Sequence, residues 1–188
     1  MELAGAFTKS ATHHTILIVN QLTFEIRHAD RADAHALSVV HEEAWRVAYA
    51  GLIPGIHLAR MLGRRGPAWW ARLAEHTQGL LVLDLGEKLV GYVTLGAARR
   101  MPDLKTGGEI FELYIKPECQ GLGFGSKLLG AALERLGIAG RRPALAWVLA
   151  DNTAAMNFYL GRGGKPVMRG VERFGETSLP KLGFLFQN

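Results

Sequence analysis

The chain has 188 residues, of which 48% are apolar and 21% carry a charge, proportions typical of an ordinary globular protein. Lysine and arginine number 22 against 17 acidic residues, and the resulting net charge of +5 fits an anionic ligand. The sequence contains no run of basic residues of the kind that nucleic-acid binders carry. The single cysteine, Cys119, excludes an intrachain disulfide, and no apolar stretch has the length of a membrane span or a secretion signal. We therefore expect a soluble, cytoplasmic protein with neither a nucleic-acid nor a membrane partner.

The first half of the chain predicts a strand followed by helices. Residues 1–22 are interpreted as an N-terminal extension and residues 23–188 as one domain. A strand should end near His28, and the helix after it carries four apolar residues at helical spacing, which predict a buried stripe: Leu37, Val40, Ala44 and Val47. A second stripe on the same helix consists of His41, Trp45 and Tyr49. Two shorter helices are expected, one after Pro54 and one beginning near Pro67.

The second half predicts an antiparallel meander and then alternating elements. Two strands should meet at a tight turn at Gly86 and Glu87, and a loop over 99–108 should lead into a strand over 109–116. A helix over 121–137, a buried strand, a second helix and a closing hairpin follow. In that hairpin Pro180 suggests an edge strand, because proline donates no ladder hydrogen bond. The order indicates an α+β (mixed α/β) fold with a mixed sheet.

Three glycines, Gly121, Gly123 and Gly125, stand where the helix over 121–137 begins. Glycine costs about 1 kcal/mol in a helix interior relative to alanine, so these positions need a reason. The first N–H groups of a helix have no partner one turn back, and a helix start without Cβ atoms suits a phosphate group. Alternatively, the glycines only form a loop and a close helix–sheet contact. The spacing matches neither a P-loop nor a dinucleotide-binding fingerprint.

Two motifs resemble the GNAT superfamily of N-acetyltransferases. The pattern Q/R-x-x-G-x-G/A is carried by Gln120, Gly123 and Gly125. The pattern N-x-x-A-x-x-F/L-Y is carried by Asn152, Ala155, Phe158 and Tyr159. Gly164 departs from the family, which usually has phenylalanine there, and the resemblance covers about residues 23–186.

The resemblance implies a mostly antiparallel sheet, flanked by helices, that splays apart between its fourth and fifth strands. Acetyl-CoA would be the co-substrate, with pantetheine in the gap and the diphosphate on the glycine loop. The implied cofactor-binding residues are Leu113, Tyr114, Ile115, Gln120, Gly121, Leu122, Gly123, Phe124, Gly125, Ser126 and Asn152. Asn152 could also be simply the N-cap of its helix.

Acetyl transfer to an amine needs a base for the ammonium, donors for the oxyanion and an acid for the leaving thiolate. By resemblance to the family's histone acetyltransferases, Glu109 is the candidate base, and Glu112 is the reserve candidate. Three residues separate the two, so a regular strand would point them to opposite faces. Tyr159 matches the tyrosine that often acts as the acid. Each of these could instead have only a structural role.

The implied activity is acetyl transfer from acetyl-CoA to a primary amine by direct attack in a ternary complex, with no metal. A small amine, a protein N-terminus or a lysine could be the acceptor, and the stripe of His41, Trp45 and Tyr49 could line its pocket or belong to the core. Cys119 is not expected to act as a nucleophile, because no histidine–acid pair accompanies it. The alternative function is a non-catalytic acyl-CoA-binding or regulatory module, and a homodimer is a possible assembly.

Overall fold

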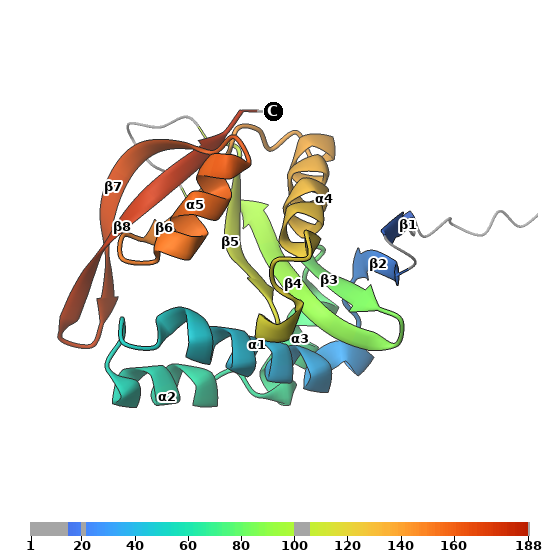
Figure 1. Ribbon diagram of the computed structural model, residues 1–188, viewed down its shortest axis with the longest axis horizontal. Coiled ribbons are helices and arrows are strands. Elements are labelled where there is room, and N and C mark those ends of the chain that lie inside the picture. Colours follow the sequence, from blue (N-terminus) through green and yellow to red (C-terminus); the bar gives the residue numbers. More distant parts are fainter. Residues whose placement is uncertain (1–14, 20–21, 100–105, 188) are drawn as a thin grey trace, which may run out of the picture.

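A computed structural model describes residues 15–19, 22–99 and 106–187, and it forms one sheet with helices packed on both faces (Figure 1). The strands are β1 (Thr15–Val19), β2 (Leu22–His28), β3 (Leu80–Leu85), β4 (Lys88–Ala97), β5 (Gly108–Ile115), β6 (Ala144–Leu149), β7 (Lys165–Phe174) and β8 (Thr177–Phe186). The α-helices are α1 (Ala34–Tyr49), α2 (Gly55–Gly63), α3 (Pro67–His76), α4 (Phe124–Ile138) and α5 (Thr153–Gly161). Two short 3-10 helices are η1 (Arg31–Asp33) and η2 (Pro117–Cys119).

The sheet runs in the order β1-β2-β3-β4-β5-β6-β8-β7. Every neighbouring pair is antiparallel except β5 and β6, which run parallel. The predicted α+β fold with a mixed, mostly antiparallel sheet is therefore confirmed. Counted from residue 23, β5 and β6 are the fourth and fifth strands, between which the gap was expected.

Part of the expected N-terminal extension contributes to this sheet. Residues 15–19 form β1, which pairs antiparallel with β2. Residues 1–14 and 20–21, and most of the loop expected over 99–108, lie outside the described residues.

Local sequence signals explain where several elements begin and turn. Asp30 and Asp33 form a capping box at the turn that leads into α1. Pro67 occupies the first turn of α3, where its missing N–H costs nothing. Gly86 and Gly175 have φ angles of 65° and 64° and form the turns of the β3–β4 and β7–β8 hairpins.

Three apolar clusters hold the layers together. Helices α4 and α5 cover one face of the sheet, where Leu128 and Tyr159 pack with strand residues such as Ile110. Helices α1 and α3 cover the other face around the fully buried Trp70. A third cluster joins α1 and α2 to the β7–β8 hairpin, with Phe174 as its hairpin member. Figure 1 shows this hairpin reaching from the top of the sheet down towards α2.

One member of the predicted α1 stripe was wrong. Leu37, Val40 and Ala44 are buried, but Val47 is 58% exposed. His41 and Trp45 are also buried, so the buried face is centred between the two predicted stripes. At 3.6 residues per turn, Val47 falls at the margin of that face and points to solvent.

The edge position suggested by Pro180 was also wrong. Strand β8 lies between β6 and β7, and β7 is the edge strand. However, the pairing of β8 with β6 stops at Lys181, one residue short of Pro180. Proline is tolerated there because no ladder bond to β6 is lost.

Candidate active site

Strands β5 and β6 separate soon after they meet. Residues 108–110 of β5 pair with residues 144–146 of β6, and beyond Ile110 these two described strands form no further pair. Strand β5 continues to Ile115 and stays paired with β4 on its other side. The backbone groups of residues 111–115 that point away from β4 therefore face an opening, where an extended ligand can take the place of a strand.

The loop at the start of α4 presents open space in front of its backbone. Gly121 and Gly123 have φ angles of 76° and 85°, and a Cβ on either would meet no atom within 4 Å. Gly125 differs, because its Cβ would lie 3.3 Å from the ring of Phe158 on α5. Two of the glycines thus allow a left-handed turn and the third allows close helix packing.

Two polar side chains near the opening form hydrogen bonds with the backbone of nearby residues. The Gln120 amide Nε2 donates to the carbonyl of Ile115 at 3.1 Å and so ties the glycine loop to the end of β5. The Asn152 Oδ1 accepts the N–H of Ala155 at 3.1 Å, which is the N-cap role expected for it.

The two candidate carboxylates share a face of β5, contrary to expectation. Thr94 of β4 pairs with Glu112, whereas the next residue, Leu95, pairs with Ile110, so Phe111 is an extra, bulged residue. The bulge resets the alternation of the strand, and Glu109 and Glu112 both lie opposite the face that α4 covers. The expected opposite orientation was wrong because it assumed a regular strand.

The surroundings of Glu109 and Glu112 differ. Glu109 is 1% exposed and lies in the segment where β5 is still paired with β6. Its Oε2 accepts the backbone N–H of Arg99 at 3.2 Å, and the Arg99 guanidinium lies 3.5 Å from Oε1. Glu112 lies in the separated segment, forms an ion pair with Arg65 and accepts the hydroxyl of Tyr92 at 3.2 Å.

A chain of buried groups leads from Glu112 into α1. The Tyr92 hydroxyl that donates to Glu112 also lies 2.7 Å from Nδ1 of His41, which is 1% exposed. Burial, assisted by the nearby Arg65, lowers the pKa of His41 to about 3, so the imidazole is neutral. The Tyr92 hydroxyl has one proton, which it donates to Glu112. In its bond with His41 the Tyr92 oxygen is therefore the acceptor, and Nδ1 of His41 is the protonated donor.

Aromatic rings surround the Glu112–Arg65 pair. The Arg65 guanidinium lies 4.8 Å from the ring centroid of Trp69 and 5.4 Å from that of Trp45. Beside them the hydroxyls of Tyr49 and Tyr114 are 2.7 Å apart. The second predicted stripe therefore does meet the strand that bears the carboxylates.

Tyr159 packs mainly as an aromatic core residue. It is 7% exposed, and its ring contacts those of Phe158, Phe184 and Phe186. Burial, with a contribution from Tyr49, raises the pKa of its hydroxyl. Among the described residues that hydroxyl has no hydrogen-bond partner.

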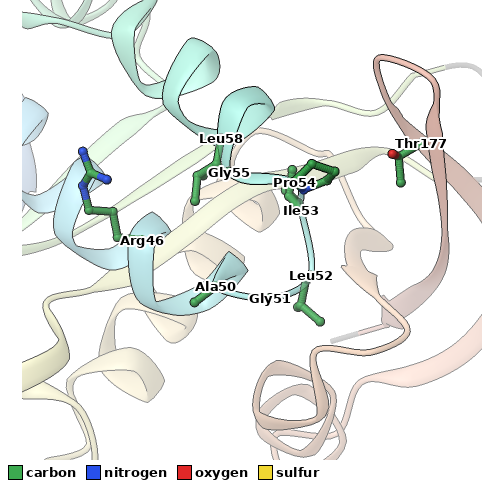
Figure 2. A pocket seen from close by; sticks show the side chains of 9 residues that line it. All are labelled: Arg46, Ala50, Gly51, Leu52, Ile53, Pro54, Gly55, Leu58 and Thr177. Carbon is green, nitrogen blue, oxygen red and sulfur yellow. The ribbon is translucent and has the colours of Figure 1, made fainter.

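A shallow pocket lies at the connection between α1 and α2 (Figure 2). It has a volume of about 580 Å³ and includes Thr177 from the β7–β8 turn. Its lining is Arg46, Ala50, Gly51, Leu52, Ile53, Pro54, Gly55, Leu58 and Thr177. None of the candidate catalytic or cofactor-binding residues belongs to it.

The model of the acetyltransferase (GNAT) family matches residues 37–163, which include the opening, the glycine loop and α5. The chain belongs to the GNAT family. An uncharacterized N-acetyltransferase of Archaeoglobus fulgidus is 31% identical over 136 residues, which are 72% of this chain and 88% of the relative.

Two solved structures with acetyltransferase in their names share the fold. The PaiA N-acetyltransferase of Thermoplasma acidophilum, solved with coenzyme A, has a TM-score of 0.68 at 21% identity. The matched region includes 84% of this chain and 97% of the PaiA chain. YncA of Salmonella typhimurium, solved with acetyl-CoA, has a TM-score of 0.62 at 21% identity. Here the matched region includes 87% of this chain and 93% of the YncA chain. The family match and the archaeal relative confirm the expected family, and the protein is an acetyl-CoA-dependent acyltransferase with N-acetyltransferase function.

Sequence reasoning missed three members of this GNAT site: Arg65, Trp69 and Tyr92. Arg65 lies 47 positions before the carboxylate that it contacts, and no local pattern links the two. Within the described residues, no group of three or more histidines, cysteines or acids could hold a metal ion. None of the helices in this part of the chain combines the length and the apolar character of a membrane span.

Proposed function

We propose that the protein transfers the acetyl group of acetyl-CoA to a primary amine by direct attack at the opening between β5 and β6. The observation that carries this proposal is the arrangement of three features around one gap. Unpaired backbone groups line it, an open glycine loop lies at one end and a carboxylate of the same strand faces α1. This arrangement offers a binding surface for a long anionic thioester and a proton acceptor for an amine.

In this proposal the backbone of β5 binds the pantetheine arm, and the loop before α4 binds the diphosphate. The arm would bond the backbone of Leu113, Tyr114 and Ile115, whose groups that point away from β4 have no strand partner, although the carbonyl of Ile115 already accepts the Gln120 amide. The diphosphate would take the N–H groups of Gly121, Leu122, Gly123, Phe124 and Gly125. The N–H groups of Gln120 and Ser126 already donate to the carbonyls of Pro117 and Gly123, so these two residues would hold the shape of the loop around the diphosphate. The open space in front of Gly121 and Gly123 supports this fit. Asn152 has an amide group left to donate to the arm after it caps α5.

We propose Glu112 as the base in preference to Glu109. Glu112 lies where β5 and β6 have separated, whereas Glu109 is fully buried where the two strands are still paired. Glu112 would take the proton of the acceptor ammonium, directly or through a water. The amine nitrogen would then bond to the thioester carbonyl carbon, and the bond from that carbon to sulfur would break. Tyr159 would give its hydroxyl proton to the departing thiolate.

Direct transfer is favoured over an acyl-enzyme intermediate by the state of Cys119. Burial, with the nearby Glu118, raises the pKa of this thiol, so little of it is the nucleophilic thiolate at neutral pH. Initial rates measured against both substrates should therefore give intersecting lines in double-reciprocal plots. Parallel lines, together with loss of turnover in Cys119→Ala, would indicate an acyl-enzyme instead.

Thiol release from acetyl-CoA across a panel of amines tests the proposal. The panel should contain small alkylamines, amino-acid-like compounds and short peptides with a free N-terminus or a lysine, because the acceptor can come from any of these classes. We expect release that depends on at least one amine. Coenzyme A binding without release for any amine would favour the alternative, a non-catalytic acyl-CoA-binding module.

A further inference from the structure

Arg65 sits in a cage that has the chemistry of an organic-cation site. Its guanidinium pairs with Glu112 and lies against the faces of Trp69 and Trp45, at 4.8 and 5.4 Å from their ring centroids. A carboxylate and two indole faces are the groups that bind a guanidinium or an alkylammonium ion. The cation that fills the cage comes from the protein itself.

The walls of this cage are held by contacts that do not involve Arg65. Glu112 keeps the hydroxyl of Tyr92 at 3.2 Å, and Tyr92 is fixed in turn by His41. The Trp45 ring packs against His41, Tyr49 and Tyr114, with centroids 4.6 to 5.9 Å apart. The Trp69 ring packs against Trp70 at 4.8 Å. The cage therefore keeps its shape when the guanidinium leaves.

Two glycines flank the short connection that carries Arg65, whose own N–H donates to the carbonyl of Leu62. Arg65 lies between Gly63, the last residue of α2, and Gly66, the N-cap of α3. A Cβ on either glycine would meet no atom within 4 Å, and neither has a positive φ angle, so crowding and turn geometry do not explain them. What glycine adds at such positions is backbone freedom. The Arg65 side chain is 28% exposed, so solvent reaches it already.

We propose that Arg65 is an internal competitor that closes a cation-binding cage formed by Glu112, Trp45 and Trp69. A ligand that carries a guanidinium or alkylammonium group displaces Arg65 and takes its place against the carboxylate. The proposal rests on the proposed function where it identifies this ligand with the acceptor, because a cationic amine that replaces Arg65 would lie against Glu112, the group that would take its proton.

A binding titration without acetyl-CoA tests the cage. Methylguanidinium chloride is added to the wild type, to Arg65→Met and to the control Arg64→Met, which removes the neighbouring exposed arginine. Intrinsic tryptophan fluorescence reports binding, since Trp45 and Trp69 are two of the four tryptophans, and sodium chloride at equal ionic strength gives the blank. We expect Arg65→Met to bind methylguanidinium ~10-fold more tightly or better, because a tethered competitor acts at an effective concentration of roughly millimolar or above.

Two further variants make the result decisive. Glu112→Gln in the Arg65→Met background should abolish the gain, and Arg64→Met should bind like the wild type. Binding in Arg65→Met that is no tighter than in the wild type, or that survives Glu112→Gln, would overturn the proposal. If Arg65→Met melts far below the wild type, Arg65→Gln, which keeps a polar group against the carboxylate, replaces it with the same expectations.

The failure of this inference is distinguishable from failure of the proposed function. If methylguanidinium binds the cage as expected but Glu112→Gln alone keeps full turnover, then the cage exists and Glu112 is not the base. If Arg65→Met gains no binding while Glu112→Gln loses turnover, then the base stands and the cage proposal falls.

Discussion

Replacing Tyr92 with phenylalanine removes one hydroxyl from the centre of the site and leaves the ring in place. Tyr92 is fully buried, and its hydroxyl bonds both Nδ1 of His41 and the carboxylate of Glu112. Glu112 would keep Arg65, but His41 would lose the partner of Nδ1 while its Nε2 is already buried without one. A buried donor left unsatisfied costs about 1–3 kcal/mol, so we expect a loss of that size in the free energy of unfolding.

Thermal melting measures this loss. For a domain of this length, 1 kcal/mol shifts the melting temperature by roughly 2–4 °C, so a loss of about 2 kcal/mol lowers it by about 4–8 °C. Tyr159→Phe is the matched control, because its hydroxyl has no hydrogen-bond partner in the described part of the chain and should shift the melting temperature little. An unchanged melting temperature in Tyr92→Phe, or an equal fall in both variants, would refute the hydrogen-bonded chain from His41 to Glu112.

Three further variants test other parts of the site. Since burial lowers the pKa of His41 to about 3, the unfolded chain binds the proton first, and stability should fall as pH drops below 6.5 by up to about 1.4 kcal/mol per pH unit. His41→Gln should flatten that fall in urea denaturation between pH 6.5 and 4.5, and an unchanged slope would contradict the buried neutral imidazole. Gly123→Ala should lower the free energy of unfolding by about 1–2 kcal/mol, because φ at this position is 85°, and should weaken coenzyme A binding in calorimetry. The control Gly130→Ala, in the middle of α4 where a Cβ meets no atom within 4 Å, should lower neither the stability nor the affinity. Tyr159→Phe should lower kcat by ~10-fold, equivalent to about 1.4 kcal/mol, and wild-type turnover at unchanged stability would leave water as the acid.

The sequence predicts the α+β fold because its signals are local, and two local motifs carry the family resemblance that implies the gap. The glycines before α4 and the residues that begin α5 are contiguous motifs, and hydrophobic alternation marks the strands around them. The N-cap of Asn152 is equally local, since its partner is three residues away.

The interior of the site could not be predicted, because it depends on contacts between distant residues and on one irregularity. The bulge at Phe111 inserts a single residue into β5. The strand is too short for its alternation of apolar and polar residues to reveal this insertion. That residue decides which face of β5 Glu109 takes relative to Glu112. Arg65 reaches Glu112 only because α3 and α1 pack on the same face of the sheet. The sequence around Arg65 and the sequence around Glu112 contain no pattern that predicts this contact.

The most direct test of the central claim compares Glu112→Gln with Glu109→Gln, using one amine that supports turnover. If Glu112 is the base, Glu112→Gln should lower kcat by ~10²–10⁴, the usual range for loss of a general base, with coenzyme A affinity unchanged. The acid limb of its pH–rate profile should flatten, while Glu109→Gln should stay close to the wild type in turnover. The reverse pattern, with Glu109→Gln inactive and Glu112→Gln near wild type, would contradict the assignment of the base to the separated segment of β5.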